Sequence, residues 1–239
     1  MLNMRASEIM RSIDLSKDGK TVDLMGCLVA AGLVSLSLST LSSVLNNVLA
    51  GVFLYLVGML ASNCLFGAFF ATASKQVWSA ADFKSLISKM PVQIAASLLV
   101  GVAQRLFSLL GGYAGAVSYG AQVFVSVCAS LLVTLISAGI AFGLYSGQSS
   151  FAKLVGDAWN SIVGNAANVL YPALPFLAWS FLLNLGYAAL ASGSPSDAVM
   201  GLCNVACIVI AGYFEVDVLL GLAINYRRLE SKDRKLGIR

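Results

Sequence analysis

The sequence predicts an all-α, polytopic integral membrane protein in which six transmembrane helices form three hairpins, with interfacial helices on the cytoplasmic side. Two observations support this prediction. Of the 239 residues, 59% are hydrophobic and 11% are charged, whereas an average soluble domain carries about 25% charged residues. The few charges also gather in short segments, and the stretches between them are long enough to cross a bilayer, which takes roughly 20 apolar residues. This composition excludes a soluble domain, a disordered chain, a coiled coil and a nucleic-acid-binding protein.

The six expected spans are separated by polar or glycine-rich breaks. Asn46 and Asn47 separate the first two, and the glycine-rich residues 111–115 separate the third and fourth. Together the spans form a six-helix transmembrane domain over residues 22–226. Their expected bounds are 22–45, 48–74, 91–110, 117–145, 162–190 and 198–226. An amphipathic N-terminal segment (1–21) precedes this domain and a basic cytoplasmic tail (227–239) follows it.

Lysine and arginine are distributed asymmetrically along the chain. Fourteen of the 15 basic residues fall in the N-terminal segment, in the segments after the second and fourth spans, and in the tail. With six spans, all of these segments lie on one side of the membrane, and the positive-inside rule makes that side the cytoplasm. We therefore expect a plasma-membrane protein with both termini in the cytoplasm. No cleavable signal peptide is expected, because the first 20 residues are polar and charged rather than apolar.

Each expected hairpin is preceded by a segment that mixes apolar and charged residues. These segments cover residues 1–18, 78–90 and 150–162. Apolar residues recur in them near three- and four-residue spacing, which favours short helices lying in the membrane interface. The alternative is that they are ordinary connecting loops with an aromatic anchor. The outer loops are very short, so the sequence offers no domain for capturing a large extracellular ligand.

Three charged residues fall deep inside expected spans: Arg105 in the third, and Glu215 and Asp217 in the sixth. An uncompensated charge there costs at least about 2.5–3.5 kcal/mol, so each should face a partner, a cavity or the head-group region. The two acids point in different directions on a helix and cannot both meet one arginine. The preferred pair is Arg105 with Glu215, as a structural ion pair or as a gate or polar lining of a pathway. The alternative for Arg105 is to extend toward the outer interface.

Glycines and prolines distinguish the fourth and fifth spans. Gly139, Gly143 and Gly147 recur every four residues, which clears one helix face for close packing. Packing within the subunit is the default interpretation, and a dimer face is the alternative. Pro172 and Pro175 are expected to interrupt the hydrogen bonding of the fifth span and to kink it. Asparagines in the spans are expected to join helices to one another. These asparagines are Asn63, Asn165, Asn168, Asn184 and Asn204.

Residues suited to catalysis or metal binding are scarce. The chain has no histidine, which removes the commonest general base and the commonest metal ligand. Its five cysteines lie within the spans, where they are expected to be small packing residues. The phosphate-binding, zinc-protease and serine-nucleophile motifs G-x-x-x-x-G-K-S/T, H-E-x-x-H and G-x-S-x-G are absent. We therefore expect no enzymatic activity, no cofactor and no metal ion.

The segment from Ser79 to Val92 reads Ser-Ala-Ala-Asp-Phe-Lys-Ser-Leu-Ile-Ser-Lys-Met-Pro-Val and leads into a span that contains Gly101 and Arg105. Together with the six spans and the cytoplasmic termini, it resembles the permease subunits of type-2 ABC exporters. Those subunits have a cytoplasmic elbow helix and a short coupling helix between spans two and three. Arg105 lies later in span three than the family's basic residue, and the outer loop between spans five and six is shorter.

The resemblance implies that a separate ATPase subunit docks on the segment from Trp78 to Lys89, and that a second permease copy or a paralogue completes the pathway. Phe83 and Leu86 are expected to supply the apolar contacts of this docking. The residues of the implied coupling segment are Trp78, Asp82, Phe83, Lys84, Leu86 and Lys89.

The expected function is that of a translocation subunit of an ATP-driven exporter for a peptide, a lipid or another amphiphile. Any ATP hydrolysis is then carried out by the separate subunit. The alternative is a non-transporting membrane helper, such as a bacteriocin-immunity or assembly factor, that binds a partner in the bilayer. A secondary transporter is disfavoured, because three hairpins of the same orientation do not form inverted repeats.

Overall fold

The computed structural model describes residues 6–17, 19–45, 47–74, 76–193 and 196–235. In these residues the regular structure is entirely helical, and six helices are long and apolar enough to cross a membrane. The chain is an all-α polytopic membrane protein, as the sequence predicts. Parts of the expected N-terminal segment, of the loop between the last two spans and of the basic tail lie outside the described residues, as do Asn46 and Lys75.

The long helices pair into three hairpins, and a short helix precedes each hairpin. The short helices are α1 (Ala6–Lys17), α4 (Ala80–Ser88) and α7 (Phe151–Val163). The hairpins are α2 (Thr21–Leu45) with α3 (Val48–Ala73), α5 (Met90–Gly115) with α6 (Tyr119–Tyr145), and α8 (Ala167–Ser192) with α9 (Asp197–Lys235). In its described residues, each of the three segments that precede a hairpin thus forms a helix.

Three helix boundaries differ from the expected ones. The glycine-rich residues 111–115 belong to the end of α5, and α6 begins after Ser118, whose hydroxyl accepts a hydrogen bond from the N–H of Ala121 at 3.1 Å. α8 begins later than expected because α7 continues to Val163, and α9 extends through the expected tail to Lys235. Unpaired backbone groups are costly in lipid, so a helix persists through glycine until the chain leaves the bilayer.

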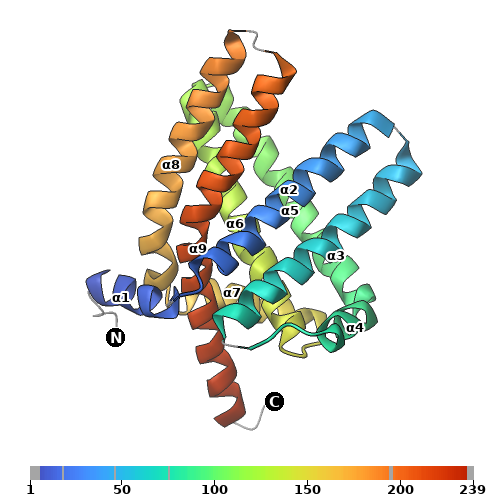
Figure 1. Ribbon diagram of the computed structural model, residues 1–239, viewed down its shortest axis with the longest axis vertical. Coiled ribbons are helices and arrows are strands. Elements are labelled where there is room, and N and C mark those ends of the chain that lie inside the picture. The colour runs from blue at the N-terminus through green and yellow to red at the C-terminus, as the bar shows by residue number, and fades with distance from the viewer. Residues whose placement is uncertain (1–5, 18, 46, 75, 194–195, 236–239) are drawn as a thin grey trace.

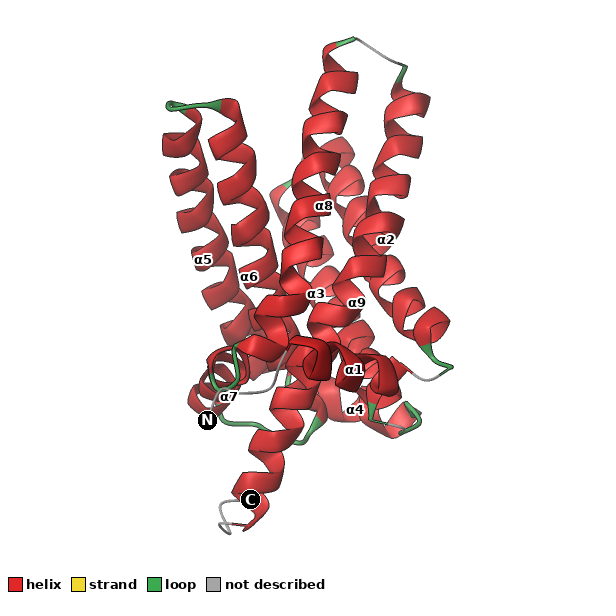
Figure 2. Ribbon diagram, turned by 90° about the vertical axis from the view of Figure 1, so that its left-hand side faces the viewer, coloured by secondary structure: helices red, strands yellow, loops and turns green. Residues whose placement is uncertain are grey.

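The three hairpins converge at one end of the molecule and separate toward the other. Figure 1 shows the α2–α3 hairpin leaning away from the α8–α9 hairpin. The short helices lie across the convergent end, and the last part of α9 projects beyond them (Figure 2). We name this end the basic end for the residues that it carries. Its described basic residues are Arg11, Lys17, Lys20, Lys84, Lys89, Lys153, Arg227, Arg228, Lys232 and Lys235.

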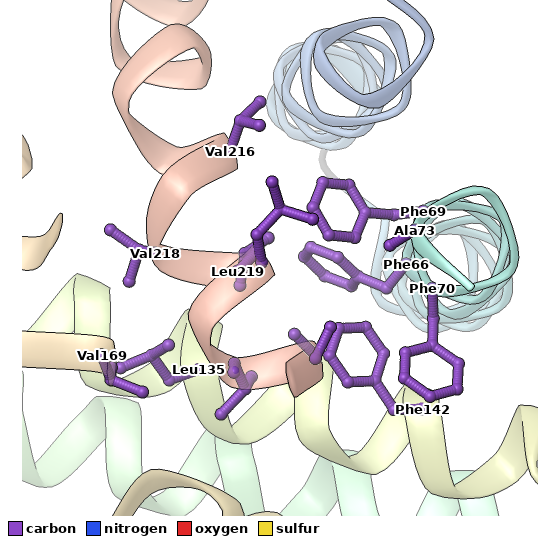
Figure 3. Close-up of a cluster of buried hydrophobic side chains, with 14 of the residues drawn as sticks. Phe66, Phe69, Phe70, Ala73, Leu135, Phe142, Val169, Val216, Val218 and Leu219 are labelled. Atoms are coloured by element: carbon purple, nitrogen blue, oxygen red, sulfur yellow. The ribbon is translucent and has the colours of Figure 1, made fainter. Parts of the chain in front are cut away.

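The main hydrophobic core lies toward the basic end, where the hairpins converge. Phe66, Phe69 and Phe70 of α3 face α9 and α6 (Figure 3). Phe70 stacks on Phe142 of α6 with ring centroids 4.6 Å apart, and Tyr226 of α9 meets both rings edge-on at 5.7 and 6.1 Å. Such aromatic pairs contribute roughly 0.5–1.5 kcal/mol each beyond the burial of their surface. The basic end is therefore the tightly packed part of the bundle.

Two of the three expected packing glycines bring α6 against α7 of the same chain. A Cβ on Gly139 would lie 2.9 Å from Cα of Ala158, and one on Gly143 would lie 2.5 Å from Cδ2 of Leu154. The close approach at these two glycines is therefore within the subunit. Gly147 does not belong to this face, because it follows the end of α6 in a turn with φ of 92°, a conformation that suits glycine.

Candidate functional site

A cavity of about 520 Å³ lies between the α2–α3 hairpin and the α5–α6 hairpin. All of its lining residues belong to these four long helices, so the cavity lies in the membrane-spanning part of the molecule. On α3 the lining extends from Gly51 to Phe66, which is about 22 Å along the helix axis. α5 packs on α6 and barely touches α3, which leaves this space open. The volume is within the ~300–1,000 Å³ typical of small-molecule sites.

The lining combines apolar side chains with uncharged polar ones. Leu38, Leu54, Val100, Val133 and Ile140 are among the apolar members. The polar members are six serines, three side-chain amides and one tyrosine. None of the lining residues is Asp, Glu, Lys or Arg. A cavity of this composition can hold a molecule that has an apolar part and an uncharged polar part.

Two buried amides close the cavity at its basic end. Asn63 of α3 donates a hydrogen bond from Nδ2 to Oε1 of Gln93 on α5, over 2.8 Å. Gln93, which is 1% exposed, donates in turn from Nε2 to the carbonyl oxygen of Leu86 in α4. Leaving a buried amide without a partner costs about 1–3 kcal/mol. These hydrogen bonds therefore hold α3, α4 and α5 together. We name the Asn63–Gln93 pair the cavity floor.

Three of the lining hydroxyl groups donate their hydrogen bonds to the protein. Ser39 donates to the carbonyl oxygen of Leu36 at 2.8 Å, and Ser97 donates to that of Ile94 at 2.9 Å. Tyr55 of α3 donates to the carbonyl oxygen of Ser97 on α5 at 3.1 Å, which links the two hairpins about one helical turn beyond the floor. Because each O–H is engaged, these hydroxyls present mainly oxygen lone pairs to the cavity.

A smaller cavity of about 340 Å³ between α5 and α6 continues the polar surface. It shares Gln104 and Val133 with the larger one. Its lining adds the hydroxyl groups of Ser108, Ser126, Ser130 and Thr134. Polar, uncharged side chains therefore line α5 from Gln93 to Ser108, which is about 22 Å of helix.

The charged residues expected inside the spans do not meet one another. Arg105 is exposed on α5, which packs mainly on α6, whereas Glu215 is half-buried on α9, which packs on α8, α2 and α7. No ion pair joins Arg105 to Glu215 in the part of the chain that the structure describes. The preferred sequence pairing required α5 and α9 to be neighbours, and the fold separates them.

Asp217 pairs instead with the N-terminal helix. Nζ of Lys17 lies 2.5 Å from Oδ1 of Asp217 and 3.7 Å from Oδ1 of Asp14. α1 can reach α9 because Ile9 and Ile13, one helical turn apart on its apolar face, are fully buried in the protein core. The amphipathic pattern of the N-terminal segment thus reflects packing on the bundle as well as position at the interface.

The segment expected to dock on an ATPase has an inward and an outward face. Leu86 is 1% exposed and packs in a cluster with Leu144 and Leu154, whereas Phe83 and Ile87 are 43% and 45% exposed. Leu86 holds α4 on the bundle and is not accessible to a partner. The expectation that Leu86 makes docking contacts is therefore corrected, while Phe83 remains accessible.

Trp78, Asp82 and Lys89 also have contacts within the chain. Trp78 stacks on Tyr145 with ring centroids 5.7 Å apart, and the carboxylate of Asp82 accepts hydrogen bonds from the N–H and the hydroxyl of Ser79, forming a cap on α4. Lys89 donates to the carbonyl oxygen of Leu144 at 2.7 Å, and burial lowers the pKa of Lys89 below its ordinary value. Of the six predicted coupling residues, Phe83 and Lys84 are the exposed ones.

A second group of buried amides joins α7, α8 and α9. Asn225, which is 4% exposed, donates from Nδ2 to the carbonyl oxygens of Ser161 and Asn165 at 2.8 and 3.0 Å. Its Oδ1 accepts a hydrogen bond from Nδ2 of Asn168 at 2.8 Å. Sequence reasoning included Asn165 and Asn168 but missed Asn225. The available signal was a lone amide after an apolar run, just before the arginines that follow span six.

The two prolines lie inside α8, which continues through both without a break. Proline has no N–H, so the carbonyl group of Asn168 lacks its intrahelical donor four residues later, at Pro172. That carbonyl oxygen lies directly against Gly221 of α9, where a Cβ would overlap it. Pro172 therefore frees a carbonyl group at a close contact between α8 and α9, and neither proline ends the helix.

The cavity offers hydrogen bonding by neutral groups and apolar contact rather than acid–base or metal chemistry. In the described residues, no three or more His, Cys, Asp or Glu residues gather where they could hold a metal ion. Comparisons of the chain with protein-family models, curated proteins and solved structures found no match.

Proposed function

We propose that this chain is the membrane-spanning translocation subunit of an ATP-driven exporter, and that the cavity between the first two hairpins is part of its pathway. The observation that carries this proposal is the link between the cavity floor and α4. Gln93 contacts Asn63 on one side and the backbone of Leu86 in α4 on the other. These hydrogen bonds connect α4 to the residues of the cavity floor, which supports a role for α4 in moving them.

The outward face of α4 is the proposed docking surface for a separate ATPase subunit. Phe83, Lys84 and Ile87 are exposed there, while Leu86 on the opposite face is buried in the bundle. A short helix with one face in the membrane subunit and one free apolar and basic face is suited to pass movement from a soluble partner to the spans. The resemblance to type-2 ABC exporters supports the same partner, together with a second permease copy or a paralogue.

The orientation of the cavity is consistent with export. The basic end faces the cytoplasm by the positive-inside rule, and the floor lies at that end of the cavity. With this orientation, the Asn63–Gln93 pair lies between the cavity and the cytoplasm, which supports a pathway that can be closed on the cytoplasmic side. The mixed lining favours an amphiphilic cargo, such as a lipid or an apolar peptide.

Affinity purification with measured ATP hydrolysis tests this proposal. The tagged chain is isolated from its native membrane in mild detergent, and the ratio of any ATPase to the chain is determined by mass spectrometry. The test variant is the double substitution Phe83→Asp with Ile87→Asp, which leaves buried Leu86 intact. The control variant is Phe151→Asp with Trp159→Asp, at exposed apolar positions of α7 at the same end of the molecule.

The proposal expects an ATPase in a fixed ratio to the chain, with ATP hydrolysis in the purified fraction. The α4 variant should lose this ATPase, and the α7 variant should retain it. No ATPase, or equal retention by both variants, would contradict the exporter function. A different integral membrane protein in fixed ratio would instead favour the membrane-helper function.

A further inference from the structure

We propose that the 520 Å³ cavity binds an uncharged, hydroxyl-bearing amphiphile that is dissolved in the bilayer, for example a molecule of the monoacylglycerol type. This inference deepens the proposed function, on which it rests for the role of the ligand as cargo. It is carried by the charge, the hydrogen-bonding character and the position of the cavity lining.

The absence of charge in the lining selects against charged head groups. Among the described residues, no acidic or basic side chain lines the cavity. Arg105 follows the lining residue Gln104 in the sequence, but it is exposed on α5 and does not belong to the lining. A phosphate, carboxylate or ammonium group placed here would lose its hydration without gaining a counter-ion, which is strongly unfavourable. The head group of the ligand is therefore neutral.

The hydroxyl groups of the lining favour a ligand that both donates and accepts hydrogen bonds. The hydroxyl groups of Ser39 and Ser97 donate to carbonyl groups of their own helices, so their oxygen atoms remain as acceptors. Tyr55 likewise donates its O–H to the carbonyl oxygen of Ser97 on α5. The other four lining serines donate no hydrogen bond among those of the described residues, so they can also donate to a ligand. A ligand hydroxyl group, which both donates and accepts, can bond to either kind of lining hydroxyl. Hydroxyl groups are the neutral donors that meet this requirement in a lipid-like molecule.

The apolar lining residues and the location of the cavity indicate the chemistry of the rest of the ligand. Leu38, Leu54 and Val133 provide a surface suited to an acyl chain, and the closed floor at Gln93 limits how far the ligand can reach. Every listed lining position lies in one of four long apolar helices, so a ligand dissolved in the bilayer can reach the space between the hairpins from the lipid. The ligand therefore enters from the membrane.

Photo-crosslinking in lipid nanodiscs tests this assignment. The full chain is placed in phosphatidylcholine nanodiscs with a diazirine-bearing monoacylglycerol, and labelling is measured with increasing amounts of unlabelled monoacylglycerol. A lysophosphatidate probe with the same acyl chain and the same diazirine is the charged counterpart. Labelled peptides are identified by mass spectrometry, and the expected sites lie on α3 and α5.

Two glycines of α5 provide matched variants. Gly101 lines the cavity, and a Cβ there would have only the Tyr55 hydroxyl oxygen nearby, at 3.8 Å, so Gly101→Leu fills the cavity without disturbing the packed core. Gly112 lies on the same helix outside the cavity, with nothing within 4 Å of a Cβ, so Gly112→Leu is the control. Thermal unfolding of both variants verifies that each is folded.

The expected result is saturable labelling by the monoacylglycerol probe that falls at least about tenfold in Gly101→Leu and changes less than about twofold in Gly112→Leu. The lysophosphatidate probe should give no saturable labelling of the same peptides. Equal labelling by both probes, or equal loss in both variants, would overturn the assigned ligand class. This assay contains no ATPase, so it is independent of the ATPase-docking test. A negative result in either test does not change the interpretation of the other.

Discussion

The carbonyl oxygen of Asn168 in α8 lies directly against Gly221 in α9, with no room for a side chain between them. Pro172 makes this contact possible, because it cannot donate the N–H that would otherwise bond this carbonyl group within α8. The buried amides of Asn168 and Asn225 form a hydrogen bond between the same two helices at 2.8 Å. A proline, a glycine and two amides from distant parts of the sequence thus form one junction of the last hairpin.

Gly221→Ala is expected to destabilise the protein by roughly 1–3 kcal/mol, because the added methyl group must push α8 and α9 apart. Thermal unfolding in mild detergent measures the effect. Gly201→Ala on the same helix is the control, since a Cβ there has nothing within 4 Å. Alanine is favoured over glycine in a helix by about 1 kcal/mol, so the control should be neutral or slightly stabilised. Equal unfolding temperatures for the two variants would contradict the close contact.

Asn225→Ala is expected to cost about 2–3 kcal/mol of stability, because it leaves the buried amide of Asn168 and two backbone carbonyl groups without their partner. Asn184→Ala is the matched control. The side chain of Asn184 bonds only to the carbonyl oxygen of Ser180 in its own helix, among the hydrogen bonds of the described residues. The control should lose less than about 1 kcal/mol in the same unfolding measurement. Similar losses in both variants would show that Asn225 does not join the helices.

Breaking the Lys17–Asp217 ion pair is expected to loosen α1. Both side chains are about one-fifth exposed, so Asp217→Asn should cost about 1–3 kcal/mol, between the values for surface and buried pairs. The exchanged double variant Lys17→Asp with Asp217→Lys should recover at least half of the loss, measured by thermal unfolding and by protease cleavage near the N-terminus. Absence of recovery would mean that the charges do not interact.

Arg105→Ala serves as the comparison for that ion pair. Arg105 is exposed on α5 and forms no ion pair among the described residues. The variant should therefore be at least as stable as the unchanged protein, because it removes an unpaired charge from a span. A loss comparable to that of Asp217→Asn would instead indicate that Arg105 is paired.

The span pattern could be predicted from the sequence because the physics behind it is local. A bilayer requires about 20 consecutive apolar residues and paired backbone groups, and both requirements can be evaluated along the chain. The helical character of residues 80–88 and 151–163 followed in the same way from apolar spacing. The prediction of a turn at residues 111–115 was wrong because glycine preference, derived from soluble proteins, is weaker than the demand for backbone pairing in lipid.

Pairings between elements could not be predicted in this way. The choice of Glu215 as partner for Arg105 depended on which helices are neighbours, and α1 supplies the partner of Asp217 from a segment that sequence reasoning placed at the interface. The cavity also escaped prediction, because six serines spread over four helices have no fixed spacing in the sequence. These hydroxyl groups face one cavity because α5 packs on α6 and barely touches α3.

The cavity floor is expected to open when Gln93 is replaced by methionine, which has a similar size but cannot bond Asn63 or the Leu86 carbonyl group. Native Cys64 adjoins Asn63 and packs half-buried against the cluster around Leu86, so it reports on this opening. In a protein with Cys64 as its only cysteine, a membrane-impermeant maleimide added at the basic end should label Gln93→Met several-fold faster than the unchanged protein. Gln104→Met is the control, because Gln104 lines the same cavity on α5 but takes no part in the floor. Equal labelling rates for the two variants would show that the Asn63–Gln93 hydrogen bond does not keep the cavity closed.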